Sequence, residues 1–229
     1  MRARFPGWLL SVALAVLASG CRTGDRRGRD ALDQLKTDRI GVAVVLAQHP
    51  GLERVLHAEF ARPVNGMKLE WSGAPPSGGG AAEHEWDGPR RRLLLRASPD
   101  FSPEDQLLAV FFEIAGARSL PLFLALEREV VAGRIDREAF PDELVRIEHG
   151  SVVAAKSVFP ALLPIPPADL DRHRLYADLL RAPDDFDAFL EWRKSEFAGA
   201  YARNREEALR RYDGLVGAGA GRDPAAGGR

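Results

Sequence analysis

The stretch "LLAVFFEIAGARS", residues 107–119, is an apolar run that carries a single carboxylate, Glu113. Ser102, just upstream, is a suitable helix N-cap because its hydroxyl can accept a hydrogen bond from a backbone N–H of the first turn, and Pro103 suits the first helical position. The pattern predicts a long helix that is largely buried. Glu113 on such a helix is either a catalytic residue or a structural carboxylate, and the functional interpretation depends on which.

Two segments before this helix have the composition of β-strands, "MKLEWSG" (67–73) and "RRRLLLRAS" (90–98). The Gly- and Pro-rich stretch between them, 73–89, predicts a long mobile connection. Earlier in the chain, "RIGVAVVLAQ" (39–48) is rich in β-branched residues, and its pattern leaves strand and helix open.

Downstream of the apolar run the sequence predicts further helices. One ends at Gly133, a suitable C-cap, and the next opens at Asp136 and runs to about Phe159. Two more are expected over 168–182 and 184–215. We therefore expect an α+β fold, a mostly helical domain in which a small β-hairpin or sheet precedes the long central helices.

The N-terminus, "MRARFPGWLLSVALAVLASGCRTG", predicts a secretory signal sequence. Arg2 and Arg4 supply its basic region. Residues 8–18 form an apolar region of 11 residues, well below the roughly 20 that a membrane-spanning helix needs. The chain is therefore expected to be exported rather than anchored by a helix.

The run Ala18-Ser19-Gly20-Cys21 resembles the lipobox of bacterial lipoprotein precursors, although alanine stands where leucine is commonest. The resemblance implies that signal peptidase II cuts before Cys21 and that the thiol carries diacylglycerol, which makes the membrane a partner through the lipid. Cys21 is the sole cysteine, which excludes an intramolecular disulfide. In Gram-negative lipoproteins an aspartate after the cysteine commonly causes retention in the inner membrane, so Arg22 favours the outer membrane, facing the periplasm. An ordinary cleaved signal with an incidental cysteine is the alternative.

Composition fits one folded domain. Removal of residues 1–20 leaves 209 residues, enough for a single domain over 31–216, and 45% of the full chain is hydrophobic. The formal charge of −1 becomes −3 without the signal sequence, so we expect no nucleic-acid partner. Residues 21–30 predict a lipidated cysteine with a flexible tether, and 217–229 predict a disordered Gly/Ala-rich tail. The oligomeric state does not follow from the sequence.

The strand 90–98 followed by a helix with Glu113 is similar to the strand and active-site helix of zincin-type metallopeptidases. In that family's H-E-x-x-H motif, two histidines one turn apart bind zinc and the glutamate acts as a general base. Aligned on Glu113, the histidine positions fall on Phe112 and Gly116, and Glu148 offers the glutamate that a downstream helix contributes in some zincins. Neither Phe112 nor Gly116 can bind zinc. The resemblance therefore implies a degenerate, catalytically silent zincin-like domain with no metal and no cofactor.

A structural role for Glu113 requires a partner, because an unpaired buried carboxylate has its pKa raised by up to ~3–5 units. Arg118, Lys156 and His149 are the candidates on this helix or on nearby ones. We expect this structural role rather than catalysis.

Other polar residues predict no site. Three arginines share one face of the second predicted strand and indicate a solvated edge, with contact to anionic lipid as the alternative: Arg90, Arg92 and Arg96. The histidines are scattered, and we expect each to be solvated or singly packed: His49, His57, His84, His149 and His173. His84 falls in the expected mobile connection.

The sequence thus predicts a lipid-anchored envelope protein with a non-enzymatic interaction or structural role and another envelope protein as its candidate partner. The alternative is an envelope hydrolase on a zincin-like scaffold that uses Glu113 and Glu148.

Overall fold

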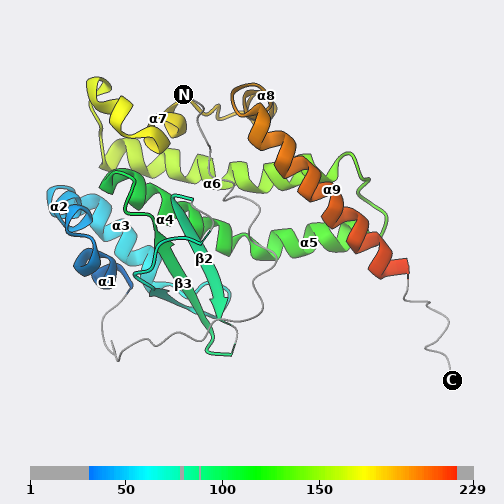
Figure 1. Cartoon of the computed structure of the whole chain (residues 1–229), viewed down its shortest axis with the longest axis horizontal. Helices are drawn as coiled ribbons and strands as arrows, with labels where there is room; N and C mark the ends of the chain where they lie inside the picture. Colours follow the sequence, from blue (N-terminus) through cyan, green and yellow to red (C-terminus); the bar gives the residue numbers. More distant parts are fainter. Residues whose placement is uncertain (1–30, 78–79, 88, 221–229) are drawn as a thin grey trace. The chain divides into compact units, whose positions relative to one another are not determined.

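The computed structural model describes residues 31–77, 80–87 and 89–220. It confirms an α+β fold that is mostly helical, with a small sheet preceding the long helices (Figure 1). Of the described residues, unit 1 comprises those up to Arg118 together with Ser151–Ala182, and unit 2 comprises Ser119–Gly150 together with those from Pro183 on. The chain thus divides into two compact units, where the sequence analysis treated 31–216 as one domain.

Unit 1 begins with three short helices: α1 (Ala31–Asp38), α2 (Ile40–Gln48) and α3 (Pro50–Ala61). The segment that the sequence left open between strand and helix is α2. Its buried side chains recur at the spacing of one helical face: Val42, Val45 and Leu46. This face of α2 belongs to the hydrophobic core of unit 1.

The sheet of unit 1 has three strands in the order β1-β3-β2: β1 (Lys68–Trp71), β2 (Ala82–Asp87) and β3 (Arg92–Ala97). β1 runs parallel to β3 and β2 antiparallel to it, so β3 is the central strand (Figure 1). The two predicted strands are confirmed, but the prediction that 73–89 is a mobile connection was wrong, because β2 lies within it. β2 contains no β-branched residue, and pairing with β3 along its whole length stabilises it instead.

One face of the sheet is covered by α4 (Pro103–Arg118). Side chains alternate between the two faces of a sheet, and alternate residues of β3 from Leu93 to Ala97 are buried. α4 contacts both β2 and β3. The Ser102 hydroxyl accepts a hydrogen bond from the backbone N–H of Asp105 at 3.1 Å, which confirms the predicted N-cap of this helix.

Three further elements complete unit 1: the C-terminal half of α6 (Phe140–Leu162), the 3₁₀ helix η2 (Pro167–Arg172) and α7 (Arg174–Arg181). Phe159 of α6 packs edge-on against Phe111 of α4, with 5.4 Å between the ring centroids. The sequence predicted one helix where η2 and α7 lie. The chain leaves helical geometry between them at His173, which has φ of −121°.

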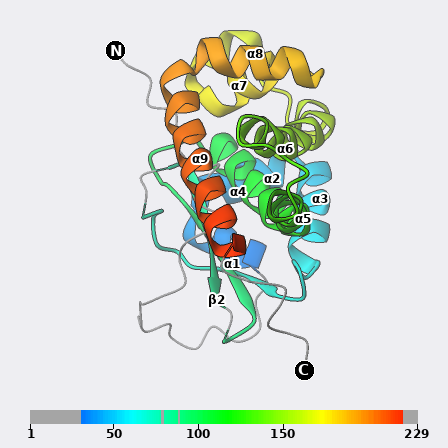
Figure 2. The ribbon, with the colours of Figure 1, turned by 90° about the vertical axis from the view of Figure 1, so that its right-hand side faces the viewer.

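Unit 2 is helical: α5 (Leu120–Val131), the N-terminal half of α6, α8 (Phe186–Glu196) and α9 (Ala198–Ala220). Gly133, with φ of +70°, donates its N–H to the carbonyl of Val130 at 2.9 Å and confirms that the helix ends here, although the C-cap itself is Ala132, one residue earlier. The single helix expected over 184–215 is interrupted at Phe197, where φ is −120°, and α8 leads into α9 after this break (Figure 2).

The C-terminal prediction is corrected at its first residues. α9 extends to Ala220, so residues 217–220 are helical rather than part of a disordered tail. The rest of the expected tail, 221–229, lies outside the described residues, as do the signal sequence (1–20) and the segment with Cys21 and the tether (21–30).

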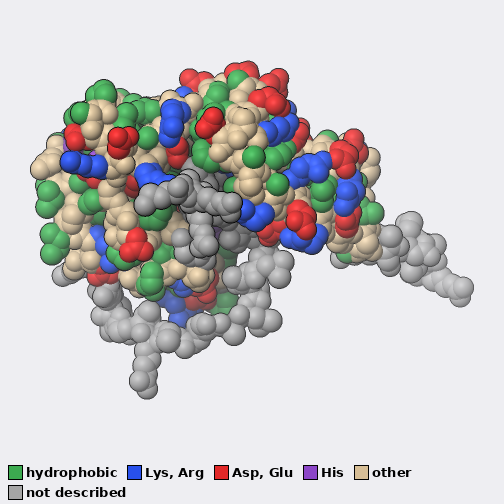
Figure 3. All heavy atoms as spheres, turned by 45° about the horizontal axis from the view of Figure 1, so that its top comes forward, with side chains coloured by type: hydrophobic (Ala, Val, Ile, Leu, Met, Phe, Trp, Pro, Cys, Tyr) green, Lys and Arg blue, Asp and Glu red, His purple; other side chains and the backbone are tan. Residues whose placement is uncertain are grey.

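The surface carries mixed charge. Figure 3 shows basic and acidic side chains interspersed with apolar ones on the face that it presents. This mixing gives no field of one sign on that face. Among the described residues, no single helix is both long and apolar enough to cross a membrane, and α4 and α5 meet the criteria of length and composition only together, as a bent pair.

Candidate functional site

β2 and α4 bring His84 and Glu113 into direct contact. His84 Nδ1 lies 2.6 Å from Glu113 Oε2, and only 5% and 6% of the two side chains are exposed. His84 pairs across the ladder with the buried Leu95, which places it on the inner face of the sheet. The partner of Glu113 is therefore a histidine that the sequence analysis placed in a mobile connection.

The three partners predicted for Glu113 interact elsewhere. Arg118 forms an ion pair with a glutamate of α3. Lys156 donates to a backbone carbonyl at 2.6 Å, and His149 donates from Nε2 to another at 3.2 Å. The predictions considered the same helix and nearby helices, whereas the observed partner comes from a strand 29 residues earlier in the chain.

The contact fixes where the imidazole ring holds its proton. An ionised carboxylate only accepts hydrogen bonds, so with Glu113 ionised, Nδ1 of His84 carries a proton and donates it. In the neutral ring Nε2 then bears a lone pair, and this atom is buried without a hydrogen-bond partner among the described residues. Trp86 packs against the ring edge-on, with 5.9 Å between centroids. An imidazole oriented by a carboxylate, with an unpaired Nε2, is an arrangement that can accept a proton in acid–base catalysis if a reacting group reaches that atom.

A metal centre is not formed by the residues that the structure describes. No group of three or more His, Cys, Asp or Glu side chains among them could hold a metal ion. Phe112 and Gly116, at the positions of the zincin histidines, both lie on α4. His173 contacts the Ser102 hydroxyl at 3.0 Å, and His149 stacks on a phenylalanine of α8 with 4.6 Å between centroids. Because zinc sites in proteins use at least three protein ligands, the pair on β2 and α4 offers too few.

Glu148, the second candidate, lies in unit 2 in a different environment. Glu148 and Arg193 of α8 are both buried, and Glu148 Oε2 is 3.9 Å from Arg193 Nη2. Burial raises the pKa of Glu148 from its usual 4.5 to about 7, and the positive charge of Arg193 opposes this rise only in part. Glu113 and Glu148 thus belong to different units, and each has its own partner.

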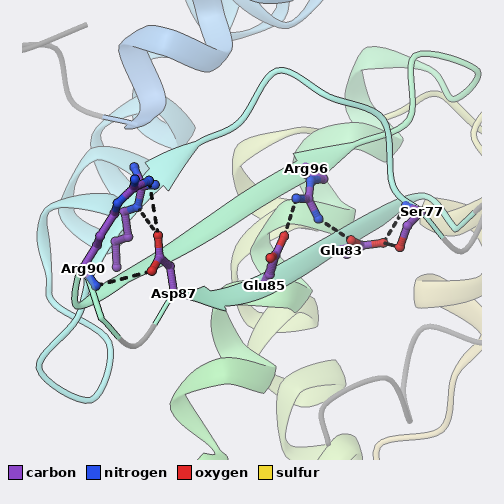
Figure 4. A network of polar contacts seen from close by, with 7 residues as sticks. Ser77, Glu83, Glu85, Asp87, Arg90 and Arg96 are labelled. Carbon is purple, nitrogen blue, oxygen red and sulfur yellow. Dashed lines mark hydrogen bonds and ion pairs between the residues drawn. The ribbon is translucent and has the colours of Figure 1, made fainter. Parts of the chain in front are cut away.

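The outer face of the sheet carries a network of ion pairs, shown in Figure 4. Two arginines of β3 each lie between two carboxylates: Arg92 between Asp87 and Glu70, and Arg96 between Glu83 and Glu85. Burial acts to raise the pKa of the Glu83 carboxyl. Hydrogen bonds from Ser77 and Arg96 outweigh this effect and hold the pKa of Glu83 below its usual value.

This network corrects the expectation of a solvated edge. The strand that carries the arginines is central, because β1 and β2 flank it. Arg92 and Arg96 are each neutralised by neighbouring carboxylates, so they do not provide the free positive charge that contact with anionic lipid requires. We therefore interpret this face as stabilising the sheet.

No family model, no curated protein and no solved structure matches the chain. The resemblances to lipoprotein precursors and to zincins therefore stay predictions. Within unit 1 the contact between His84 and Glu113 is the candidate site, because it combines two titratable groups, burial and a ring nitrogen without a hydrogen-bond partner.

Removal of one member of this pair leaves the other buried without its partner. We expect His84→Leu and Glu113→Leu each to lower the free energy of unfolding by about 1–3 kcal/mol. The double variant should lose less than the sum, because no buried polar group is then left unpaired. Denaturant unfolding of the wild type and the three variants measures the coupling. The same cycle on the exposed pair Glu191 and Lys194 should give a coupling near zero, and strictly additive losses for His84 and Glu113 would contradict a direct interaction.

Glu148 makes stability depend on pH. Below about pH 4.5 its carboxyl is protonated in both states. Between that pH and about 7 the unfolded chain releases the proton first, so the free energy of unfolding falls as pH rises, and the contribution is fully lost above the folded pKa of about 7. The size of the fall is on the order of 3 kcal/mol.

Denaturant unfolding between pH 4 and 8 tests this dependence. Glu148→Gln should remove the fall, whereas Glu143→Gln on the same helix α6 should retain it. An equally steep fall in Glu148→Gln and the wild type would rule out Glu148 as its source.

Proposed function

We propose that the chain is a lipid-anchored envelope protein whose folded part has an interaction or structural role rather than a catalytic one. The observation that carries the proposal is the sequence of the first 21 residues, a basic start and an apolar region of 11 residues followed by Ala18-Ser19-Gly20-Cys21. Arg22 supports the outer membrane as the location, with the folded part facing the periplasm.

The environment of Glu113 supports the non-catalytic role. Its carboxylate is bound by His84, and its side chain is only 6% exposed. A general base must lie within hydrogen-bond reach of the proton that it removes from substrate or water. A carboxylate held in this way stabilises the fold and is withdrawn from solvent, which favours a structural role for Glu113. We propose another envelope protein as the partner of the folded part.

Acid–base catalysis is the second candidate, and the buried, unpaired Nε2 of His84 is the observation that favours it. His84 would accept the proton, and Glu113 would orient the ring and stabilise its charged form. The hydrolase alternative with Glu113 and Glu148 becomes a proposal centred on His84 and Glu113, because Glu148 has its own partner in unit 2.

Cys21→Ala tests the lipid anchor. We expect this variant to lose incorporation of a labelled fatty acid and to leave the membrane fraction, because no other thiol can carry diacylglycerol. Arg22→Ala, which keeps the cysteine, should still be labelled. Labelling of Cys21→Ala equal to that of the wild type would overturn the proposed anchor.

Zinc binding tests whether His84 and Glu113 belong to a metal-dependent hydrolase. The purified lipidated protein, stripped of metal and then given zinc, should retain no stoichiometric zinc by mass spectrometry, because its described residues offer no group of three ligands. Stoichiometric zinc that is lost in His84→Ala would contradict the non-catalytic proposal and would direct hydrolase assays to this site.

A further inference from the structure

α2 presents an apolar face to solvent. Its sequence, IGVAVVLAQ, contains no charged residue. Ile40 is 77% exposed, the highest value among the large hydrophobic side chains that the structure describes, and Val44 is 50% exposed. Ala47 is exposed as well. Residues spaced by four and then three positions lie along one side of a helix, so Ile40, Val44 and Ala47 form a continuous outer stripe.

The core leaves this stripe uncovered because the opposite side of α2 meets the rest of unit 1. α2 contacts α1, α3 and α4, and its inner side chains belong to the hydrophobic core: Val42, Val45 and Leu46. A soluble helix normally places polar residues on its outer side, and α2 places apolar ones there. The stripe is therefore suited to contact with a second apolar environment.

We propose that the outer stripe of α2 docks on the phospholipid surface that holds the lipidated Cys21, an inference that rests on the lipid anchor proposed above. Nine residues separate Cys21 from Ala31, the first residue of α1. Even fully extended, this length of chain spans only about 35 Å. α1 adds eight residues, about 12 Å of helix, before α2 begins. The anchor therefore keeps α2 close to the bilayer and raises its effective concentration there.

The charge of the tether favours the same surface. Residues 22–30, RTGDRRGRD, contain four arginines and two aspartates, a net charge of +2. Basic residues next to a lipid anchor are attracted to anionic headgroups. α2 itself has no charged residue, so its outer stripe can enter the interface without removing a charge from water.

The size of the stripe favours lipid over protein. α2 has nine residues, about 13 Å of helix, and its outer stripe carries only two large side chains. A stable protein interface buries more than about 1,000 Å² with a well-packed core, which this stripe alone does not supply. A bilayer that is already bound through a covalent lipid requires only a small additional apolar contact.

A single thiol on the stripe tests the proposal. In the lipidated chain Cys21 is blocked, so Val44→Cys supplies the only free thiol for an environment-sensitive fluorophore. Val153→Cys on α6, in the same unit, is the matched control, since Val153 is 41% exposed and Val44 50%. Each labelled protein is reconstituted into vesicles of phosphatidylethanolamine and phosphatidylglycerol, with and without a quencher attached to the lipid chains.

We expect a blue-shifted emission and several-fold stronger quenching at position 44 than at position 153. Ile40→Glu should reduce the quenching at position 44, while the protein still floats with the vesicles through its lipid. Equal, weak quenching at both positions in a protein that floats would overturn the docking and leave the anchor intact. A blue shift at position 44 that depends on protein concentration and not on vesicles would also overturn it, in favour of a second copy of the chain. Failure to float would instead overturn the anchor, and the docking with it.

Discussion

The hydrogen bond between His84 and Glu113 ties the edge strand β2 to the helix α4 and so links the sheet to the helix that covers it. β2 has no β-branched residue and follows a Gly- and Pro-rich stretch, so its own sequence gives it little tendency to form a strand. It is held by the ladder with β3 along one edge, by His84 on the inner face and by ion pairs on the outer face. An unpaired carboxylate inside α4 would be costly, and β2 supplies the partner that removes this cost.

The sequence could predict the elements whose signals are local. The N-cap at Ser102, the apolar run of α4 and the leucines of β3 each act within a few residues, and all three were found. β2 has a local signal too, because His84 and Trp86 alternate with three acidic residues in AEHEWD. In the sequence analysis the flanking glycines and prolines outweighed that alternation. The segment forms a strand because it pairs with β3, and a local pattern contains no information about such a partner.

The two buried glutamates show why the candidate site could be predicted only in part. Glu113 and Glu148 have the same side chain on helices with apolar residues, and sequence reasoning identified both. One accepts a short hydrogen bond from a histidine, whereas the other lies 3.9 Å from an arginine and has its pKa raised by burial. The difference comes from tertiary partners on β2 and α8, which sequence spacing does not reveal.

The apolar character of α2 on both sides explains why its periodicity was ambiguous. A helix with one apolar face shows a clear repeat, but IGVAVVLAQ is apolar at nearly every position and reads equally well as a strand. The core covers only one side of this helix, so Val42 and Leu46 are buried and Ile40 is exposed. The ambiguous periodicity and the exposed stripe therefore have one cause, which is that the outer face of α2 is apolar. The first helix that the structure describes begins ten residues after Cys21, so if Cys21 carries lipid as proposed, the bilayer is an apolar phase within reach of that face.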